Sequence, residues 1–188
     1  MNIEKELRSS NLLLSGPTGT GKTRAVIDIL RRLDSLGYSQ AYVLDRQGEG
    51  ILTDDYIGIS SMIHFSSSYY VIDDVRKRLF DRIRGIENTD SKILFVVDYG
   101  IAYPNMSEEY LGYLQYISMK GRAKLIDLII VSHLDDNEDL PPILNKSRFH
   151  RIEFSLGIKA PNSEVASKAS NRVVFVNFEK SDNSTYKE

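Results

Sequence analysis

The chain consists of short apolar segments separated by longer segments in which apolar residues recur at helical spacing. Continuously apolar runs, typical of strands buried on both faces of a parallel sheet, occupy 11–15, 41–45, 92–98 and 125–132. Weaker strand patterns occupy 62–65, 151–155 and 172–178. Helical spacing predicts helices over 22–36, from residue 73 or 74 to 85, and over 107–121, with a short turn or helix over 141–145. This alternation predicts an α/β layered sheet with right-handed crossovers.

Local signals mark the ends of the predicted helices. Ser107, which is followed by two glutamates, is a predicted N-cap, and Asp73 or Asp74 is the predicted N-cap of the preceding helix. The three helices are expected to end at glycines, namely Gly37, Gly85 and Gly121.

Length and composition limit the architecture. The 188 residues suit a single domain over 1–180, and we expect the polar tail over 181–188 to be frayed. An apolar content of 41% is enough to fill a core in a domain of this size. The 24 Lys and Arg against 26 Asp and Glu give a net charge of −2, which excludes a generally basic nucleic-acid coat and leaves local basic patches open.

The cellular setting is constrained by what the sequence lacks. The chain has no cysteine, which excludes disulfides, thiolate zinc sites and a cysteine nucleophile, and permits a reducing compartment. Residues 1–10 do not have the pattern of a secretory signal, and no apolar run reaches the roughly 18 residues that a membrane span needs. We therefore expect a cytoplasmic protein.

A phosphate-binding motif lies between the first apolar run and the first helix. The motif G-x-x-x-x-G-K-[ST] is matched by Gly16, Pro17, Thr18, Gly19, Thr20, Gly21, Lys22 and Thr23. Its glycines let backbone N–H groups turn inward around a phosphate, and the helix N-terminus adds a positive dipole end. Lys22 is expected to reach the β- and γ-phosphates, and the Thr23 hydroxyl is expected to ligate Mg²⁺.

A nucleotide-bound magnesium also needs a carboxylate at the end of a nearby hydrophobic strand. Asp98, at the end of the run over 92–98, is our predicted ligand. The rival, Asp73, follows a shorter apolar run and is better explained as a helix cap. A guanine-specific protein would need an N-K-x-D element, and the segment over 145–148 lacks the aspartate, so ATP is the predicted nucleotide.

The order of segments resembles the FtsK/HerA superfamily of ring-forming, DNA-pumping ATPases, and most of all the compact genome-packaging ATPases of membrane-containing viruses. The resemblance covers about residues 11–155 and rests on GPTGTGKT, AYVLDRQGEG, KILFVVDYG, GRAKLIDLIIVSH and LPPILNKSRFHRIEF. It implies a P-loop NTPase three-layer sandwich of the RecA-like (ASCE) type, with a mainly parallel central sheet. It also implies that the strand over 125–132 lies between the strand that ends at Asp98 and the strand before the phosphate loop.

The chain departs from this family at the position after the magnesium aspartate. The family has a glutamate there that polarises the attacking water, whereas this chain has Tyr99, a poor base at pH 7. In the wider fold a neighbouring strand can present the base, so we interpret Glu49 as the candidate base and Asp45 as the second choice. A loop carboxylate exposed to solvent remains an equal alternative for Glu49.

Two further roles are implied by the resemblance. His133, which follows Ser132, stands where the family has a glutamine sensor, and a neutral imidazole can donate a hydrogen bond in its place. Arg122 stands where the family's trans-acting arginine is expected, with Arg148 and Arg151 as rivals. A structural histidine and an ordinary helix-end arginine are the alternatives.

Two clusters could contact DNA. The helix before residue 85 carries five basic residues, Arg76, Lys77, Arg78, Arg82 and Arg84, which form either a phosphate-binding patch or a solvated face. Tyr110, Tyr113 and Tyr116 recur at helical spacing, which is more typical of packing or a subunit contact than of base stacking.

The phosphate motif predicts a nucleotide-binding protein, and the resemblance implies an ATP-hydrolysing motor subunit that forms a hexameric or pentameric ring and translocates double-stranded DNA into a viral capsid. ATP and Mg²⁺ are the predicted cofactors. The predicted partners are further copies of the chain, double-stranded DNA, and capsid or membrane-associated virion proteins, with a location in the host cytoplasm or in the virion. A small-molecule or nucleoside kinase and a non-catalytic nucleotide-binding assembly protein are the alternatives.

Overall fold

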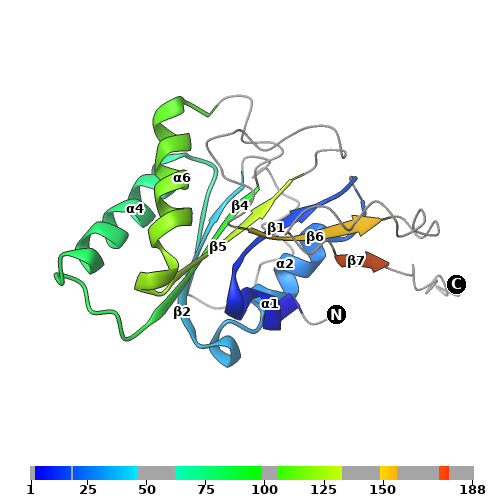
Figure 1. Ribbon diagram of the computed structural model, residues 1–188, viewed down its shortest axis with the longest axis horizontal. Helices are drawn as coiled ribbons and strands as arrows, with labels where there is room; N and C mark the ends of the chain where they lie inside the picture. Colours follow the sequence, from blue (N-terminus) through cyan, green and yellow to red (C-terminus); the bar gives the residue numbers. More distant parts are fainter. Residues whose placement is uncertain are drawn as a thin grey trace, which may run out of the picture.

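The fold is built on a twisted parallel sheet (Figure 1). The computed structural model describes residues 3–17, 19–45, 62–98, 106–132, 149–155 and 174–177. Within them the strands are β1 (Asn11–Ser15), β2 (Tyr38–Leu44), β3 (Ile63–Ser66), β4 (Lys92–Asp98), β5 (Ile126–Val131), β6 (Phe149–Ser155) and β7 (Val174–Asn177). They form one seven-stranded sheet in the order β3-β2-β4-β5-β1-β6-β7, and all neighbours in it are parallel.

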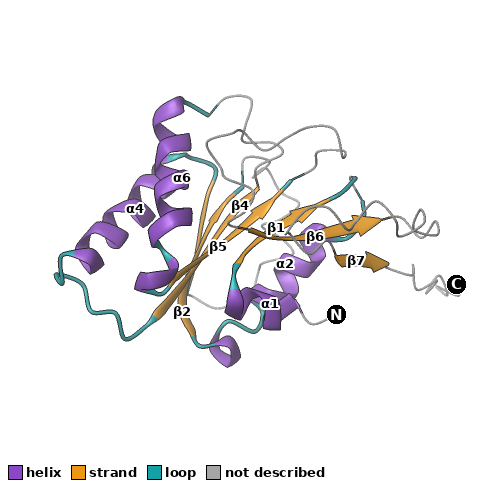
Figure 2. Cartoon of the chain, in the orientation of Figure 1, coloured by secondary structure: helices purple, strands orange, loops and turns teal. Residues whose placement is uncertain are grey.

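Helices cover both faces of the sheet and make the molecule a three-layer sandwich (Figure 2). The helices α4 (Tyr70–Ile83) and α6 (Glu108–Lys120) lie side by side on one face, and α1 (Ile3–Ser9) and α2 (Lys22–Leu30) cover the other. Two short 3₁₀ turns, η1 (Asp34–Leu36) and η3 (Arg122–Lys124), precede β2 and β5.

The core has two halves because successive strand residues point to opposite faces. Leu44 and Val97 pack with α4 and α6, whereas Val43 and Val96 pack with α2. The central strands are buried on both faces, as their continuously apolar sequences predict.

The main architectural predictions are confirmed. The sheet is parallel, it lies between helical layers, and β5 lies between β4 and β1. The predicted strands are present with shifts of up to three residues at their ends, the largest at the start of β2. Ser107 is the N-cap of α6, since its side chain accepts a hydrogen bond from the backbone N–H of Tyr110. The short turn or helix over 141–145 and the tail over 181–188 lie outside the described residues.

The predicted start of α4 is wrong. The helix begins at Tyr70, with Tyr69 as its N-cap, rather than at Asp73 or Asp74. The apolar pair Val71 and Ile72 is buried in the core, and this packing draws the helix three residues toward the N-terminus. Asp73 therefore lies within the first turn of α4 rather than at its cap, and its carboxylate pairs with Arg76.

The helix that follows the phosphate motif is shorter than predicted. It ends at Leu30, and the chain then turns through η1 to Gly37. Leu33 and Leu36 stay buried on the same side of the sheet, so the apolar spacing persists although the backbone has left the α-helix. Helix α1 was not predicted, because its seven residues are too few to show a helical period.

In the parts of the chain that the structure describes, no helix combines the length and the apolar character needed to cross a membrane.

Candidate nucleotide-binding site

The phosphate motif joins the carboxyl end of β1 to the N-terminus of α2, as predicted. In an open parallel sheet, ligands bind at the carboxyl edge, where the strands end and the helices begin. Gly16, Gly19 and Gly21 have φ values of 136°, 81° and 92°, a region that favours glycine. A Cβ on Gly16 would lie 2.2 Å from the carbonyl oxygen of Phe154 in β6, so a side chain there would force the loop away from the sheet.

Lys22 folds back over this loop. Its side chain is buried, with the residue 3% exposed, and its ammonium donates to the backbone carbonyl oxygens of Gly16 at 2.5 Å and Pro17 at 2.7 Å. The Thr20 hydroxyl donates to the same Pro17 carbonyl at 2.7 Å. The loop therefore closes around the charge that is expected to meet the phosphates. Thr23 follows in the first turn of α2, half-buried, and Thr18 lies outside the described residues.

Asp98 ends β4 at the same edge of the sheet and is 8% exposed. It pairs in register with Val131 of β5, and β5 in turn pairs with β1. The backbone N–H of Ser132 donates to the carbonyl of Leu14 at 2.7 Å, which ties the end of β5 to the start of the phosphate loop. The strand that leads to His133 thus ends beside the loop, as the resemblance implied.

Asp45 is a second buried carboxylate at this edge. It directly follows β2, is 5% exposed, and its backbone N–H donates to the Ser66 carbonyl of β3 at 3.0 Å. Leu44 pairs with Val97, so Asp45 and Asp98 are the next residues of two adjacent strands. The alternation of side chains places both on the α2 face.

These residues fit a magnesium nucleotide. Mg²⁺ prefers oxygen ligands and is usually held by one or two carboxylates together with substrate phosphates. Thr23 and Asp98 supply such oxygens. Over the described ranges, no group of three or more His, Cys, Asp or Glu side chains is placed to hold a metal by itself. Gly16 lets the loop approach β6 closely, and the positive φ values of Gly16, Gly19 and Gly21 allow the turn that phosphate-binding loops use.

Several predicted site residues lie outside the described residues. These are Glu49, the candidate base, His133, the candidate sensor, Tyr99, and Arg148. Their roles stay predictions. Arg151, the other rival for the arginine finger, lies in β6 and donates to the Ser15 hydroxyl at 2.9 Å, next to the phosphate loop.

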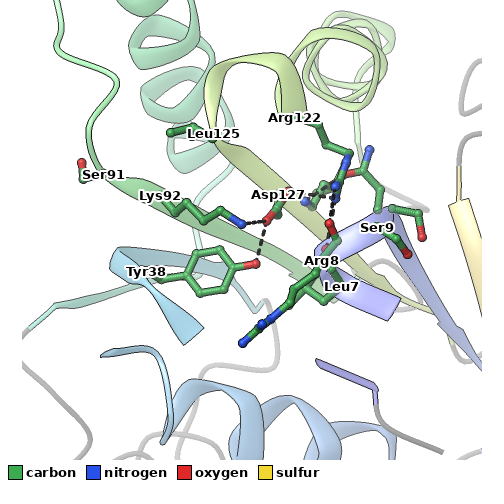
Figure 3. A network of polar contacts seen from close by, with 12 residues as sticks. Leu7, Arg8, Ser9, Tyr38, Ser91, Lys92, Arg122, Leu125 and Asp127 are labelled. Carbon is green, nitrogen blue, oxygen red and sulfur yellow. Dashed lines mark hydrogen bonds and ion pairs between the residues drawn. The ribbon is translucent and has the colours of Figure 1, made fainter. Parts of the chain in front are cut away.

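Arg122 lies at the opposite, amino edge of the sheet, in η3 before β5 (Figure 3). Its guanidinium donates to the backbone carbonyls of Leu7 at 3.1 Å and Arg8 at 2.9 Å, and to a carboxylate oxygen of Asp127 at 2.9 Å. It therefore joins the last turn of α1 to β5. Action on a neighbouring subunit stays a prediction, and these contacts within the chain show a structural role that sequence reasoning missed.

Asp127 is the centre of this amino-edge network. It is 3% exposed, accepts a hydrogen bond from the Tyr38 hydroxyl at 2.7 Å, and lies 3.6 Å from the Lys92 ammonium. Burial, followed by the charge of Asp127, raises the pKa of Tyr38 above its usual range. A single aspartate inside an apolar strand pattern was the available sequence signal, but its partners come from distant segments.

The basic cluster on α4 is largely engaged within the chain. Arg82 is 2% exposed and donates to Glu87 at 2.9 Å and to the carbonyls of Ser91 and Lys124 at 3.0 and 2.9 Å. Arg76 pairs with Asp73, and Arg78 pairs with Glu87 at 3.3 Å. Lys77 and Arg84 remain exposed, so the patch is smaller than the sequence indicated.

The three tyrosines of α6 pack against α4. Tyr110 stacks on Tyr69 with ring centroids 5.4 Å apart, and Tyr116 stacks on Phe80 at 5.1 Å. The Arg76 guanidinium lies 4.2 Å from the ring centroid of Tyr113. The packing interpretation of this spacing is therefore confirmed.

No family model and no curated protein matches the sequence. Solved structures do match. The conjugation coupling protein TcpA of pCW3, in its monomer form with ATPγS, matches with a TM-score of 0.53 and 20% identity over 77% of this chain and 48% of that one. ATPases 2 and 3 of EssC from Geobacillus thermodenitrificans match with a TM-score of 0.56 and 12% identity over 79% of this chain and 32% of that one. The Aeropyrum pernix ORC1 protein in complex with DNA matches with a TM-score of 0.51 and 21% identity over 82% of this chain and 43% of that one.

This chain has the fold of P-loop NTPases. The sequence motif, the loop after β1 and the sheet order agree with the similarity to these structures. At identities of 21% or less the similarity extends to the fold alone, and the chain spans less than half the length of each of the three proteins.

Proposed function

We propose that the protein is an ATP-hydrolysing motor subunit that assembles into a ring and translocates double-stranded DNA, in the packaging of a viral genome into a capsid. One observation carries the ATPase part: a glycine loop with a buried lysine lies at the same sheet edge as a buried aspartate, with one strand between β4 and β1. This arrangement supports a single site in which the loop binds phosphate and Asp98 is a ligand of Mg²⁺.

The residues divide the chemistry among them. Backbone N–H groups of the loop and Lys22 bind the β- and γ-phosphates, while Thr23 and Asp98 hold Mg²⁺, which neutralises phosphate charge. His133, which follows Ser132 in the sequence, senses the γ-phosphate, and a carboxylate at the end of β2 or in the following segment orients the attacking water. In this proposal Lys22 exchanges its loop carbonyls for phosphate oxygens.

The ring, the DNA and the location are the finer parts of the proposal. The resemblance to the FtsK/HerA superfamily supports a ring of five or six subunits in which Arg122 reaches the neighbouring site. The structurally similar proteins include a conjugation coupling protein with ATPγS, ATPases 2 and 3 of EssC, and an ORC1 protein in complex with DNA, which supports an ATPase that acts on DNA. The proposed partners also include capsid or membrane-associated virion proteins, and the proposed location is the host cytoplasm or the virion.

ATP hydrolysis by the assembled protein, measured with and without linear double-stranded DNA, tests the proposal. We expect a ring by size-exclusion chromatography with light scattering, and turnover that rises with DNA. Heparin is the matched control, because it offers negative charge without a duplex. Equal stimulation by heparin, or none by DNA, would remove the DNA motor.

The same assay separates the two alternatives. A small-molecule or nucleoside kinase would transfer the γ-phosphate to a nucleoside rather than to water, which labelled ATP and product chromatography detect. A non-catalytic assembly protein would bind ATP without any turnover, and the tyrosine at position 99 is the feature that favours it.

A further inference from the structure

The amino edge of the sheet carries more positive charge than the buried Asp127 requires. Arg122 pairs with one carboxylate oxygen of Asp127 at 2.9 Å, and the Tyr38 hydroxyl donates to the other at 2.7 Å. Lys92 lies 3.6 Å from the same carboxylate, its side chain is 32% exposed, and its ammonium forms no hydrogen bond with the residues that the structure describes. Because Arg122 already balances the carboxylate, Lys92 is an additional cation at this edge.

Arg8 adds a further cation in the last turn of α1. A basic residue at a helix end ordinarily donates to the last carbonyls of its helix. Here Arg122 makes these bonds instead, to the carbonyls of Leu7 and of Arg8 itself. Arg8 is exposed, and among the described residues its guanidinium has no hydrogen-bond or ion-pair partner. The usual structural role of such an arginine is therefore already filled.

The additional cations lie near one another. The Lys92 ammonium is 5.5 Å from the ring centroid of Tyr38, and the Arg8 side chain extends from α1 toward the same tyrosine (Figure 3). Burial and then Asp127 raise the pKa of Tyr38, whereas the charges of Arg122 and Arg8 act in the opposite direction, as expected of cations close to its hydroxyl.

Lys124 continues this line of positive charge into η3. The Arg82 guanidinium binds the carbonyls of Ser91 and Lys124 through the same nitrogen, which holds η3 beside the start of β4, where Lys92 lies. Basic residues therefore follow the amino edge from α1 through β4 to η3.

The opposite ends of α4 and α6 have the other sign of charge. At the carboxyl edge these helices begin with the exposed residues Asp74, Glu108 and Glu109. Acidic residues are favoured at a helix start, but they repel a long polyanion. Arginines along α4 are paired with acidic residues of the chain. The charge distribution thus favours the amino edge over these surfaces for a nucleic-acid backbone.

Resting on the proposed DNA-translocating function, we propose that Arg8, Lys92 and Lys124 form a contact surface for the phosphate backbone of double-stranded DNA. These three residues are the amino-edge cations. Backbone phosphates supply the negative charge that Asp127 alone does not provide, and such contacts carry no base-sequence information. Arg122 stays bound to Asp127 and α1 and keeps Arg8 beside the sheet.

Substitutions in the full chain test this surface. They are Arg8→Ala, Lys92→Ala and Lys124→Ala, singly and combined, and the charge-conserving pair Arg8→Lys with Lys92→Arg. Lys77→Ala, which removes an exposed lysine of α4, is the matched control. Fluorescence anisotropy measures affinity for two short duplexes of unrelated sequence over a range of salt concentrations. Basal ATPase activity, the mass of the assembly by light scattering and the thermal midpoint are measured alongside.

We expect the triple variant to bind both duplexes about tenfold or more weakly, and to the same extent. The slope of log affinity against log salt becomes shallower by about 0.9 for each phosphate contact that is lost. Basal ATPase activity and assembly mass stay as in the wild type. The charge-conserving pair and Lys77→Ala retain wild-type affinity and salt dependence.

Three results would overturn the proposal: wild-type affinity and salt slope in the triple variant, an equal loss of affinity in Lys77→Ala, or a changed assembly mass with unchanged DNA affinity. The last result would assign the surface to a contact with a second copy of the chain. If the triple variant does not fold, the single variants decide, since unchanged affinity in all three contradicts the proposal. A wild-type protein that hydrolyses ATP but binds neither duplex refutes the proposed DNA function itself, which differs from a wild type and variants that bind equally well.

Discussion

The carboxyl edge and the amino edge of the parallel sheet both bury charged side chains, but these side chains have different kinds of partner. At the amino edge, the buried Asp127 holds the partly exposed Arg122, which also donates to carbonyls of another helix. The buried Arg82 is held there by a glutamate and by carbonyls of two connecting segments. At the carboxyl edge, Lys22 is held by carbonyls of the loop that it serves. Phosphate oxygens can replace such acceptors without breaking the fold.

The direction of the chain explains the difference. Helices that follow parallel strands begin at the carboxyl edge, where their N–H groups favour anions, and end at the amino edge, where carbonyls remain unpaired. Arg122 supplies donors to the last turn of α1, and Arg82 supplies them to η3. A buried charge alone therefore does not mark a functional site, because at the amino edge it completes the fold.

The largest expected effect concerns Arg122. Its observed contacts lie at the amino edge, whereas the proposed function gives it a role in the active site of a neighbouring subunit. If it acts on the neighbouring subunit, Arg122→Ala lowers ring ATPase turnover by about 10³-fold or more. Asp127→Asn removes the ion pair with Asp127 but keeps the guanidinium and its bonds to the Leu7 and Arg8 carbonyls, so we expect it to lower stability and leave turnover intact. Steady-state ATPase assays and urea unfolding of both variants measure the two effects.

Mixed rings provide the second part of this test. Arg122→Ala and Lys22→Ala subunits mixed together recover part of the activity when each mixed interface pairs an intact loop with an intact arginine. If the two substitutions at Arg122 and Asp127 have equal effects on turnover, Arg122 is a structural residue of the amino edge and the finger lies elsewhere.

Lys22→Ala changes the carboxyl edge alone. We expect a loss of about 10³-fold in turnover, since a donor to the transferring phosphoryl group disappears. We expect little change in unfolding free energy, because the Gly16 and Pro17 carbonyls that lose this donor lie outside the two clusters of the apolar core. Lys120→Ala, exposed at the end of α6, is the matched lysine control. An ATPase assay checks the expected loss of turnover, and the urea midpoint checks the unchanged stability. Unchanged hydrolysis would contradict the phosphate-loop assignment.

Arg82→Ala changes the amino edge alone and reverses this pattern. Removing the guanidinium leaves the Ser91 and Lys124 carbonyls without a donor and opens a cavity, which we expect to cost about 3 kcal/mol of unfolding free energy. Arg84 is exposed and lies two positions away, so Arg84→Ala is the matched control, and we expect it to change the unfolding free energy by about 0.5 kcal/mol or less. Equal denaturation midpoints for the two variants would show that the hydrogen bonds of Arg82 do not stabilise the fold.

Tyr38→Phe gives the smallest effect and a pH signature. The hydrogen bond to Asp127 is worth about 1.5 kcal/mol at pH 7. Because the pKa of Tyr38 is raised in the folded state, its contribution is present below the unfolded value near 10 and is lost as the pH rises above it. The stability difference between wild type and Tyr38→Phe, measured by urea unfolding, therefore shrinks from pH 9 to pH 11, and a constant difference would contradict this account.

Local sequence patterns were sufficient for the phosphate loop, the strand that ends at Asp98, and the parallel sheet. Each of these depends on a continuous stretch of chain, in which a motif or an apolar run directly reports backbone geometry or burial on both faces. The place of β5 between β4 and β1 came from the family resemblance and is confirmed. The early start of α4 was missed because the burial of Val71 and Ile72 outweighed the capping preference of the aspartates.

Contacts between distant segments were decided by the tertiary structure. Asp45 and Asp98 share a face only because β2 and β4 are adjacent in a particular register, and a shift of one residue would place them on opposite faces. Arg82 and Arg122 look like surface arginines in the sequence, since a local pattern cannot show which carbonyls of other segments lie within reach of a long side chain. The sequence thus determined the loop and the strands, whereas strand order and register determined which charged residues meet.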